Sequence, residues 1–367
     1  MLLKMDFTVT ESAAVDLDDA RVIRALQIAP RIGFATAGSV LGLSEAGVAR
    51  RFRRMQRDGI IRVIGVLNTG AIGQSRWVVR IRCRPGSAWA IADSLARRED
   101  VTWVALSAAG SELTCVLRSR TDSQRDDLLG ERLPRASAVL DIQASVMLHQ
   151  FIGGRGHYWA ALRGVLTPEQ EADLGADGSP YSETPVVSTE AVALDIDDRR
   201  LIDLLSRDGR ASLADLARTT ESTPGRVSRR LQHLLRSRAL DIDVETAAVA
   251  LGYLARANLW LRVHPARLEE AGRLLAEMPE VVFVTALSGR DNLLAVVHCR
   301  GLHELFAFAS ARVGGVPGVE ALDVAPIVQQ VKQIGTRLVD ERLVVRPPAP
   351  GESTSSDAGS RPSPVGR

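Results

Sequence analysis

Length and composition are those of an ordinary globular protein. The 367 residues leave room for about two to four domains, and 46% apolar with 25% charged residues are usual globular values. No uninterrupted apolar run approaches the roughly 20 residues of a membrane span. Three cysteines without a CxxC motif suit a reducing compartment. We therefore expect a cytoplasmic protein with no membrane partner.

The net charge of +2 is unevenly distributed. Residues 17–62 hold nine Arg against four acidic residues, and residues 196–241 hold ten against seven. Lys occurs only at positions 4 and 332, so guanidinium groups carry nearly all the positive charge. Guanidinium forks suit phosphates and guanine edges, whereas a GC-rich genome would favour Arg codons without such a role.

The two arginine-rich segments are copies of one pattern. At an offset of 179 the matching residues include Leu26 and Leu205, Arg31 and Arg210, Val48 and Val227, and Arg50-Arg51 and Arg229-Arg230. Further along, the offset becomes 180, with the pairs Pro85 and Pro265, Leu95 and Leu275, and Val139 and Val319. Solenoid repeats are only about 20–50 residues long. The chain is therefore a duplication of a larger unit with several elements.

Each copy begins with three helices. The apolar periodicity predicts helices over residues 18–28, 34–41 and 45–58, and again over 197–207, 213–219 and from 224 onward. Ser44 and Thr223 are suitable N-caps for the third helix of each triplet. A short extended stretch follows each triplet, at residues 60–67 and 240–247.

The rest of each copy alternates strands and helices. The first copy predicts strands at 77–83, 101–107, 113–118 and 139–148, with helices at 87–98 and 122–133. The second predicts strands at 258–263, 281–287, 293–299 and 319–331, with helices at 266–277 and 302–313. The order β-α-β-β-α-β is the split βαβ unit, a four-stranded antiparallel sheet with both helices on one face.

The predicted fold class is α+β, with two winged-type helix-turn-helix domains alternating with two ferredoxin-like βαββαβ (split βαβ) domains. We expect helix-turn-helix domains at residues 16–62 and 194–241, and βαββαβ domains at residues 76–150 and 255–335. Residues 151–193, rich in Gly, Pro, Ser, Thr and acidic residues, are expected to be a flexible linker. Residues 346–367 are expected to be a disordered tail.

The third helix of each triplet has an arginine-rich face opposite its apolar stripe. At about 100° per residue, Val48, Phe52 and Met55 turn toward the core. The DNA-contact candidates, caps included, are Ser44, Ala46, Arg50, Arg51, Arg53, Arg54 and Arg57 in the first copy and Thr223, Arg226, Arg229, Arg230, His233 and Arg236 in the second. Such a helix suits a major groove, where its N-terminal part reads bases and guanidiniums bind phosphates. A solvated surface helix laced with salt bridges is the alternative, but the same face seen twice favours double-stranded DNA.

These segments resemble a known family. The pattern Leu17-Asp18-Asp19, Leu26, Gly42-Leu43-Ser44, Val48-Ala49-Arg50-Arg51-Phe52 and Gly59-Ile60-Ile61 is similar to the helix-turn-helix of the Lrp/AsnC transcription regulators. The βαββαβ unit resembles that family's effector and oligomerisation domain. The resemblance implies DNA binding in the nucleoid, a small effector such as an amino acid, and association of chains. A tandem pair departs from the family, and one chain could supply both halves of a pseudo-dimer.

The two copies depart from the family's motifs in different places. The second copy keeps the turn Asp208-Gly209-Arg210, where the first has Ala29-Pro30-Arg31. Its lower charge and the loss of an apolar staple before the third helix predict that the second copy is the weaker DNA-contacting unit. The family's effector hairpin has a Gly followed by Asp, and its counterparts here are Ala109, Gly110, Ser111 and Glu112 in the first copy and Ser288, Gly289, Arg290, Asp291 and Asn292 in the second. Plain turn chemistry is the other interpretation of these hairpins.

We expect no catalytic residue, no metal and no cofactor. The sequence lacks the patterns GxxxxGK[ST], GxGxxG, HExxH and GxSxG. The leading interpretation is a sequence-specific DNA-binding regulator modulated by a small effector. The alternative is a metabolite-binding or protein-interaction module with weak or lost DNA binding, and an enzyme or enzyme-regulating subunit is a distant third.

Overall fold

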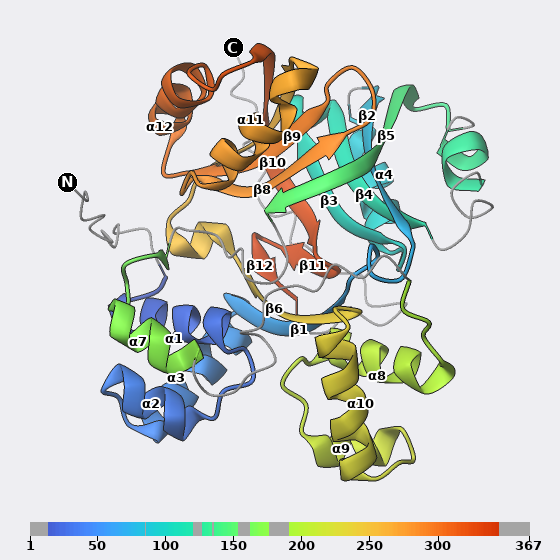
Figure 1. Cartoon of the computed structure of the whole chain (residues 1–367). Coiled ribbons are helices and arrows are strands. Elements are labelled where there is room, and N and C mark those ends of the chain that lie inside the picture. Colours follow the sequence, from blue (N-terminus) through green and yellow to red (C-terminus); the bar gives the residue numbers. More distant parts are fainter. Residues whose placement is uncertain are drawn as a thin grey trace, which may run out of the picture.

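The computed structural model describes residues 14–84, 86–119, 127–133, 136–152, 162–175 and 191–344. Figure 1 shows two groups of helices at one end, a two-stranded ribbon above them, and a larger β-structure flanked by helices at the other end. This arrangement has the predicted α+β class, with two helix-turn-helix units and two βαββαβ units. None of the helices in the described ranges is long and apolar enough to cross a membrane. The predicted tail at 346–367 lies outside the described residues.

Each helix-turn-helix unit begins with the same capping arrangement. Asp16 caps the first helix of one unit and Asp195 caps that of the other, in both cases through a reciprocal capping box with an Asp three residues later. Carboxylates here also complement the helix dipole. The six helices are α1 (Leu17–Ile28), α2 (Phe34–Leu41), α3 (Glu45–Arg57), α8 (Ile196–Arg207), α9 (Leu213–Thr219) and α10 (Pro224–Arg236).

The ribbon between the two units has the symmetry of a dimer. Strand β1 (Ile61–Leu67) pairs antiparallel with its own repeat mate, β6 (Leu240–Thr246). Ile64 lies opposite Asp243, its equivalent at the offset of 179, so a pseudo-twofold axis passes between these two residues. Gly209 lies close against β1, because a Cβ there would come within 2.9 Å of the Ile64 backbone.

Each βαββαβ unit forms a four-stranded antiparallel sheet, as predicted. The strand order is β3-β4-β2-β5 in the first unit and β8-β9-β7-β10 in the second. The strands are β2 (Ser75–Cys83), β3 (Val101–Ser107), β4 (Glu112–Ser119), β5 (Val139–Ile152), β7 (Ala255–Val263), β8 (Val281–Leu287), β9 (Leu293–Cys299) and β10 (Val319–Gln333). The helices against them are α4 (Ala88–Ala96), α11 (Leu268–Ala276) and α12 (Leu302–Ala307), the last extended by the π-helical turn η6 (Phe308–Val313).

Two long strands cross from one sheet to the other and close the sheets into a ring. The first part of β5 pairs with β2 and its end pairs with β8, while β10 pairs first with β7 and then with β3. The registers agree at the offset of 180, since Met147 faces Leu287 and Ile327 faces Ser107. Strands predicted at 139–148 and 319–331 thus run further, because their ends pair with the other repeat. The predicted pairing of the two units within one chain is confirmed.

Each sheet has one hydrophobic core on the side of its own helices and shares a second core with the other sheet. Alternate residues such as Val79 and Ile81 pack under the helices of their own unit, whereas Val78 packs with Trp260 of the other unit between the two sheets. Because successive strand residues point to opposite faces, one strand serves both cores. Trp260 is only 5% exposed and anchors the contact between the two sheets.

The predicted flexible linker contains a docked segment, which corrects that prediction. Residues 162–175 include α7 (Pro168–Gly175), which packs on α1 and α2. Leu162 and Leu174 are fully buried in the core of the helix-turn-helix pair. Thr167 and Gln170 form a reciprocal cap at the start of α7. Residues 153–161 and 176–190 of the predicted linker lie outside the described residues.

A C-terminal hairpin was not predicted. Strands β11 (Thr336–Val339) and β12 (Arg342–Leu343) follow β10 and return toward the ribbon. The Leu343 amide donates to the Gly59 carbonyl at 2.8 Å, and Arg62 donates to Thr336 at 2.8 Å. The hairpin therefore joins the β-structure to the helix-turn-helix pair. The helix predicted at 122–133 is described only as the π-helical turn η2 (Asp127–Arg132) and Leu133.

Candidate nucleic-acid interface and effector pocket

The third helices, α3 and α10, are built alike. Ser44 accepts a hydrogen bond from the Gly47 amide at 3.1 Å, and Thr223 accepts one from the Arg226 amide at 3.3 Å, so both predicted caps are observed. Pro224 occupies the first turn of α10, where its missing N–H costs nothing. Each helix buries one apolar stripe and exposes the opposite face.

One arginine of α3 anchors that helix to the start of α1. Arg51 lies 2.7 Å from Asp16, 2.9 Å from Asp19 and 3.2 Å from Asp18, and Arg54 also pairs with Asp19. The hydrogen bond from Arg51 to Asp16 is the main cause that raises the pKa of the guanidinium above its usual value. Burial tends to raise the pKa of the Asp16 carboxyl, but the bonds and charge of Arg51 and the Asp19 amide lower it overall.

The equivalent residues of the second copy form the same arrangement. Arg230 pairs with Asp195, Asp197 and Asp198, at 2.6 Å from Asp198, and these are the repeat mates of the residues around Arg51. We call each arrangement an Asp–Arg anchor.

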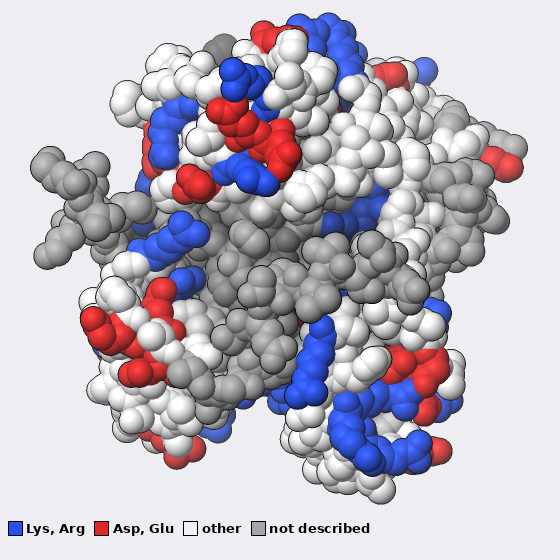
Figure 2. Space-filling view, in the orientation of Figure 1, with Lys and Arg blue, Asp and Glu red and all other residues white. Residues whose placement is uncertain are grey.

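The anchors give three residues of the sequence-based DNA-contact set a structural role, and their contact with DNA stays a prediction. Arg51, Arg54 and Arg230 hold α3 and α10 in place instead of standing free on the surface. The exposed cationic residues of that set are Arg50, Arg53, Arg57, Arg226, Arg229, His233 and Arg236. Ala46 is exposed beside them. Arg57 makes an exposed contact with the neighbouring Asp58. Figure 2 shows basic atoms gathered over the unit of α8 to α10.

A reciprocal pair of arginines joins the two helix-turn-helix units. Arg210 donates to the carbonyl oxygens of Pro30 and Ile32 at 2.6 and 2.7 Å. Arg31 donates to the carbonyl oxygens of Gly209 and Ala211, the latter at 2.8 Å. Each acceptor is the repeat mate of an acceptor on the other side. This is the self-complementary contact of a twofold interface, here within one chain.

We call this reciprocal pair the arginine lock, and Arg210 makes further contacts within it. Arg210 also lies over the rings of Phe34 and Phe52, at 4.7 and 5.4 Å from their centres. Burial and the nearby charge of Arg31 lower the pKa of Arg210 to about 10. Arg210 thus combines two charge-assisted hydrogen bonds with cation–π contacts.

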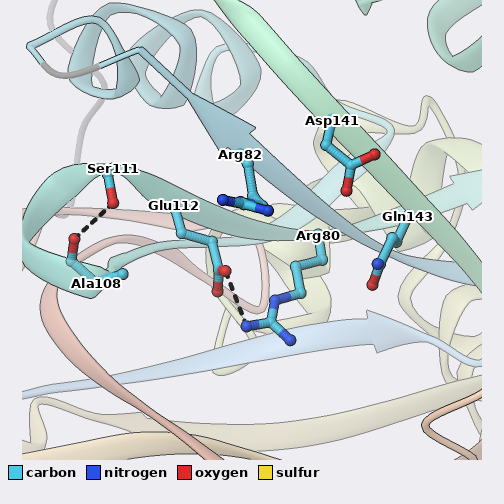
Figure 3. Close-up of a pocket in the computed structure, with 7 residues that line it drawn as sticks. All are labelled: Arg80, Arg82, Ala108, Ser111, Glu112, Asp141 and Gln143. Carbon is cyan, nitrogen blue, oxygen red and sulfur yellow. Dashed lines mark hydrogen bonds and ion pairs between the residues drawn. The ribbon is translucent and has the colours of Figure 1, made fainter.

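A cavity of about 380 Å³ lies at the predicted effector hairpin of the first βαββαβ unit. Figure 3 shows its lining: Arg80 and Arg82 from β2, Ala108, Ser111 and Glu112 from the hairpin, and Asp141 and Gln143 from β5. The predicted Ser111 and Glu112 therefore line a pocket, while Ala109 and Gly110 form the turn beside it with positive φ. Arg80, Arg82, Asp141 and Gln143 were not predicted. The sequence did contain a signal for them. Arg80 and Arg82, like Asp141 and Gln143, are two residues apart on a strand and therefore share one face.

The two arginines of the pocket differ in their described ion pairs. Arg80 bonds Glu112 at 2.9 Å and Asp323 of the other unit at 2.8 Å. Burial tends to lower the pKa of Arg80, but these bonds raise it overall. Arg82 and Asp141 face each other on neighbouring strands. Neither forms an ion pair within the part of the chain that the structure describes (Figure 3).

The corresponding hairpin of the second unit is closed by its own hydrogen bonds. Asn292 donates to the Val263 carbonyl and accepts from the Val263 amide, both at 2.8 Å. Ser288 accepts from the Val146 amide at 2.9 Å, and Gly289 has a positive φ. Arg290 is exposed and Asp291 is half-buried. Ser288 and Asn292 thus have structural hydrogen bonds, and an effector role for this hairpin stays a prediction.

This architecture is that of a helix-turn-helix regulator with an attached ligand-binding domain. The AsnC-type helix-turn-helix model matches residues 15–56 and 194–235. The Lrp/AsnC ligand-binding domain model matches residues 256–336. The two helix-turn-helix matches confirm the tandem duplication.

Single-unit relatives match about one repeat of the chain. An uncharacterized HTH-type transcriptional regulator of Pyrococcus furiosus is 30% identical over 146 residues, which are 39% of this chain and 96% of the relative. The HTH-type transcriptional regulator FL11 of Pyrococcus horikoshii is 27% identical over 147 residues, 39% of this chain and 94% of FL11. The chain belongs to the Lrp/AsnC family of transcription regulators, with DNA-binding and effector-binding domains.

One solved structure is similar over most of the chain. The siroheme decarboxylase NirDL superposes with a TM-score of 0.57 and 14% identity, covering 86% of this chain and 92% of that chain. At this identity the likeness concerns the fold alone. It indicates that two such units occur together in another solved protein, whose chemistry does not transfer with the fold.

Proposed function

We propose that this protein is a sequence-specific DNA-binding transcription regulator whose two helix-turn-helix units act as one reading surface. The observation that carries this proposal is the reciprocal lock of Arg31 and Arg210, which holds the two units in a pseudo-twofold arrangement. Paired units of this kind address two half-sites on one face of a duplex. The exposed arginines of α3 and α10 supply the contacts with phosphates and base edges.

Salt dependence tests the DNA-binding part. Six exposed guanidiniums, those of Arg50, Arg53 and Arg57 and of Arg226, Arg229 and Arg236, would lie among the phosphates whether they bind a phosphate or a base edge. If each displaces counterions, the slope of log K against log[salt] is about −5. Affinity should then fall about 10³-fold between 50 and 200 mM salt. Fluorescence anisotropy with duplexes from the region around the protein's own gene would measure it. A flat line would contradict DNA binding, and a slope near about −8 would mean that the anchor arginines also contact phosphates.

We further propose that the pocket of the first unit binds a small zwitterion such as an amino acid. Arg82 would bind a carboxylate and Asp141 an ammonium group, since these unlike charges lie on neighbouring strands in a cavity of suitable size. Its position beside Asp323 of the other unit gives a ligand contact with both repeats. We also propose that further chains associate, because proteins of the Lrp/AsnC family form oligomers.

Calorimetric titration with amino acids tests the effector part. Arg82→Ala should weaken binding by about 10-fold or more, because a charge-assisted hydrogen bond is lost. Arg262→Ala is the matched control, since Arg262 is the repeat mate of Arg82 and pairs with Glu320 at 3.5 Å. Equal effects of the two variants would contradict the assignment of this pocket. Ligand binding without any DNA binding would instead favour the metabolite-binding alternative.

We also propose that the protein is not an enzyme. In the part of the chain that the structure describes, no three His, Cys, Asp or Glu side chains gather as a metal-ligand set. NirDL is described as a siroheme decarboxylase and has been solved with an iron-uroporphyrin III analogue. Adding an iron porphyrin carboxylate to this protein tests whether it shares the decarboxylase activity of NirDL. No change in the porphyrin absorbance is expected, whereas saturable binding followed by CO₂ release would contradict the proposal.

A further inference from the structure

The two reading helices are related by the pseudo-twofold axis but differ in sequence. The axis is fixed independently by the β1–β6 ribbon, by the reciprocal arginine lock and by the crossing strands. Helices related in this way meet a duplex in opposite orientations, so their half-sites are inverted. In a homodimer the two half-sites would also have the same sequence, because the two helices are identical. Here the two helices come from different parts of one chain, so their half-sites can differ in sequence.

Some exposed residues of the two helices are the same. Arg50 and Arg229 are repeat mates, as are Arg57 and Arg236, and all four are exposed. The Asp–Arg anchors place these helices alike on their own units. Equivalent side chains therefore reach equivalent positions of their half-sites.

Other exposed residues differ in their chemistry. Arg53 corresponds to Gln232, and both are exposed. In the first turn, Glu45, Ala46 and Gly47 correspond to Pro224, Gly225 and Arg226. The first turn carries an acidic side chain in α3 and a guanidinium in α10. Arg pairs with the guanine edge, whereas Gln pairs with the adenine edge.

We propose that this protein recognises an asymmetric DNA site, made of two inverted half-sites of different sequence, and binds it in a single orientation. The proposal rests on the proposed DNA-binding function and names the kind of operator that it uses. Arg50 and Arg229 specify the base pairs common to both half-sites. Arg53 favours guanine in the half-site under α3, and Gln232 favours adenine at the corresponding position under α10.

Selection from a random duplex library with the full chain tests the form of the site. The expected product is a spaced, inverted motif whose two arms share some positions and differ at others. A perfectly palindromic motif overturns the proposal and leaves the DNA-binding function intact. If no sequence is enriched, the proposed function itself fails and the inference falls with it.

A pair of matched labels tests the single orientation. Ala35 on α2 and Ala214 on α9 are exposed repeat mates, so each can be replaced by Cys and carry a DNA-cleaving iron chelate. The label at Ala35→Cys should cut near one arm of the selected site, and the label at Ala214→Cys near the other. Cleavage of both arms by each label would overturn the proposal, because the chain would then bind in both orientations.

Exchange of the differing residues tests their roles as specificity determinants. Gln232→Arg should shift the preference of its arm from adenine toward guanine by roughly 10–100-fold, and Arg53→Gln should shift the other arm in the opposite sense. The double exchange should prefer the site with the two arms interchanged at this position. Arg273→Gln, on the exposed surface of α11, is the control and should leave the motif unchanged. Uniform weakening on all sequences, with no change of preference, would overturn the assignment of these two residues.

Discussion

The two helix-turn-helix units share the contacts that stabilise them and differ on their outer faces. Both keep the Asp–Arg anchor, the capped third helix and the arginine that reaches across the axis. Only the first unit is covered by α7, where Glu171 pairs with Arg24 and Gln170 donates to the Val40 carbonyl. In the second unit the matching positions are Asp203 and Thr219, both exposed. The arginines that bind backbone carbonyls across the axis are alike in the two units, whereas the outer faces and the ribbon pair Ile64 and Asp243 differ.

The two βαββαβ units differ in the same way. The first keeps an open pocket with Arg82 and Asp141, while the second closes its hairpin through Asn292. Arg80 and Trp260 are repeat mates that meet across the two sheets, with the guanidinium 5.0 Å from the ring centre. A symmetric pair at this point would bring two arginines together. One replacement by Trp removes that repulsion, which a duplicated chain can do and a homodimer cannot.

The largest effect is expected at the arginine lock. Arg210→Ala should cost about 3–4 kcal/mol of stability at the interface between the two units, because it leaves two carbonyls unsatisfied and removes two ring contacts. Arg31→Ala should cost about 2 kcal/mol, because the carbonyl oxygens of Gly209 and Ala211 lose their charged donor. Chemical denaturation followed by hydrogen exchange in α1 and α8 measures both. If either variant lost less than about 1 kcal/mol, these carbonyl bonds would not hold the two units together.

A smaller, one-sided effect is expected at α7. Leu174→Ala should destabilise the first unit by about 3 kcal/mol, because a fully buried leucine leaves a cavity. Amide exchange should accelerate in α1 and α2 but not in α8 and α9. Leu254→Ala, at a leucine that is 56% exposed, is the control. Equal acceleration in both units would contradict the view that α7 supports only the first.

The two Asp–Arg anchors should differ modestly. Asp19 pairs with two arginines and its side chain is 1% exposed, whereas Asp198 pairs with Arg230 and is 10% exposed. We expect Asp19→Ala to cost about 2 kcal/mol and Asp198→Ala about 1 kcal/mol. Thermal unfolding of the two variants compares them. The reverse order would show that the second arginine on Asp19 adds no stability.

The ribbon should give the chain a pH dependence. Burial is the main cause that raises the pKa of Glu245 to about 8, opposed by the hydrogen bond from Thr336 and the charge of Arg62 and reinforced by Asp243. The folded state then holds a proton that the unfolded state releases above pH 4.5, the ordinary value. This contribution is complete below that pH and is lost as the pH rises through about 8, with a slope of up to about 1.4 kcal/mol per pH unit. Glu245→Gln should flatten the dependence of the melting temperature between these limits. An unchanged pH profile would contradict the protonated carboxyl.

Local and repeated features were predictable from the sequence. Helix caps at Ser44 and Thr223, the strand alternation and the duplication define nearly every element that the structure describes. The Asp–Arg anchor could also have been found, because Asp16, Asp18 and Asp19 recur at the offset of 179 together with Arg51. The capping box of Thr167 and Gln170 likewise marked α7. This capping box lies in a segment whose polar composition led to the prediction of a flexible linker.

Contacts between the repeats were harder to predict. The ends of β5 and β10 pair with strands more than 100 residues away, and no local pattern identifies such partners. The pocket depends on the register of Arg82 opposite Asp141, which is set by the folded sheet. The arginine lock was visible only as a matched pair, Arg31 and Arg210, whose acceptors are backbone carbonyls and leave no trace in the sequence.

The central claim is that both halves of the twofold arrangement come from one chain. Ile64 and Asp243 lie opposite each other at its axis, so the double variant Ile64→Cys with Asp243→Cys should form a cross-link on oxidation at low protein concentration. Denaturing, non-reducing electrophoresis should then show a band of one chain that migrates faster than its reduced form. Cross-linked species of two chains, with no such monomeric band, would contradict the account, because the ribbon would then form between chains.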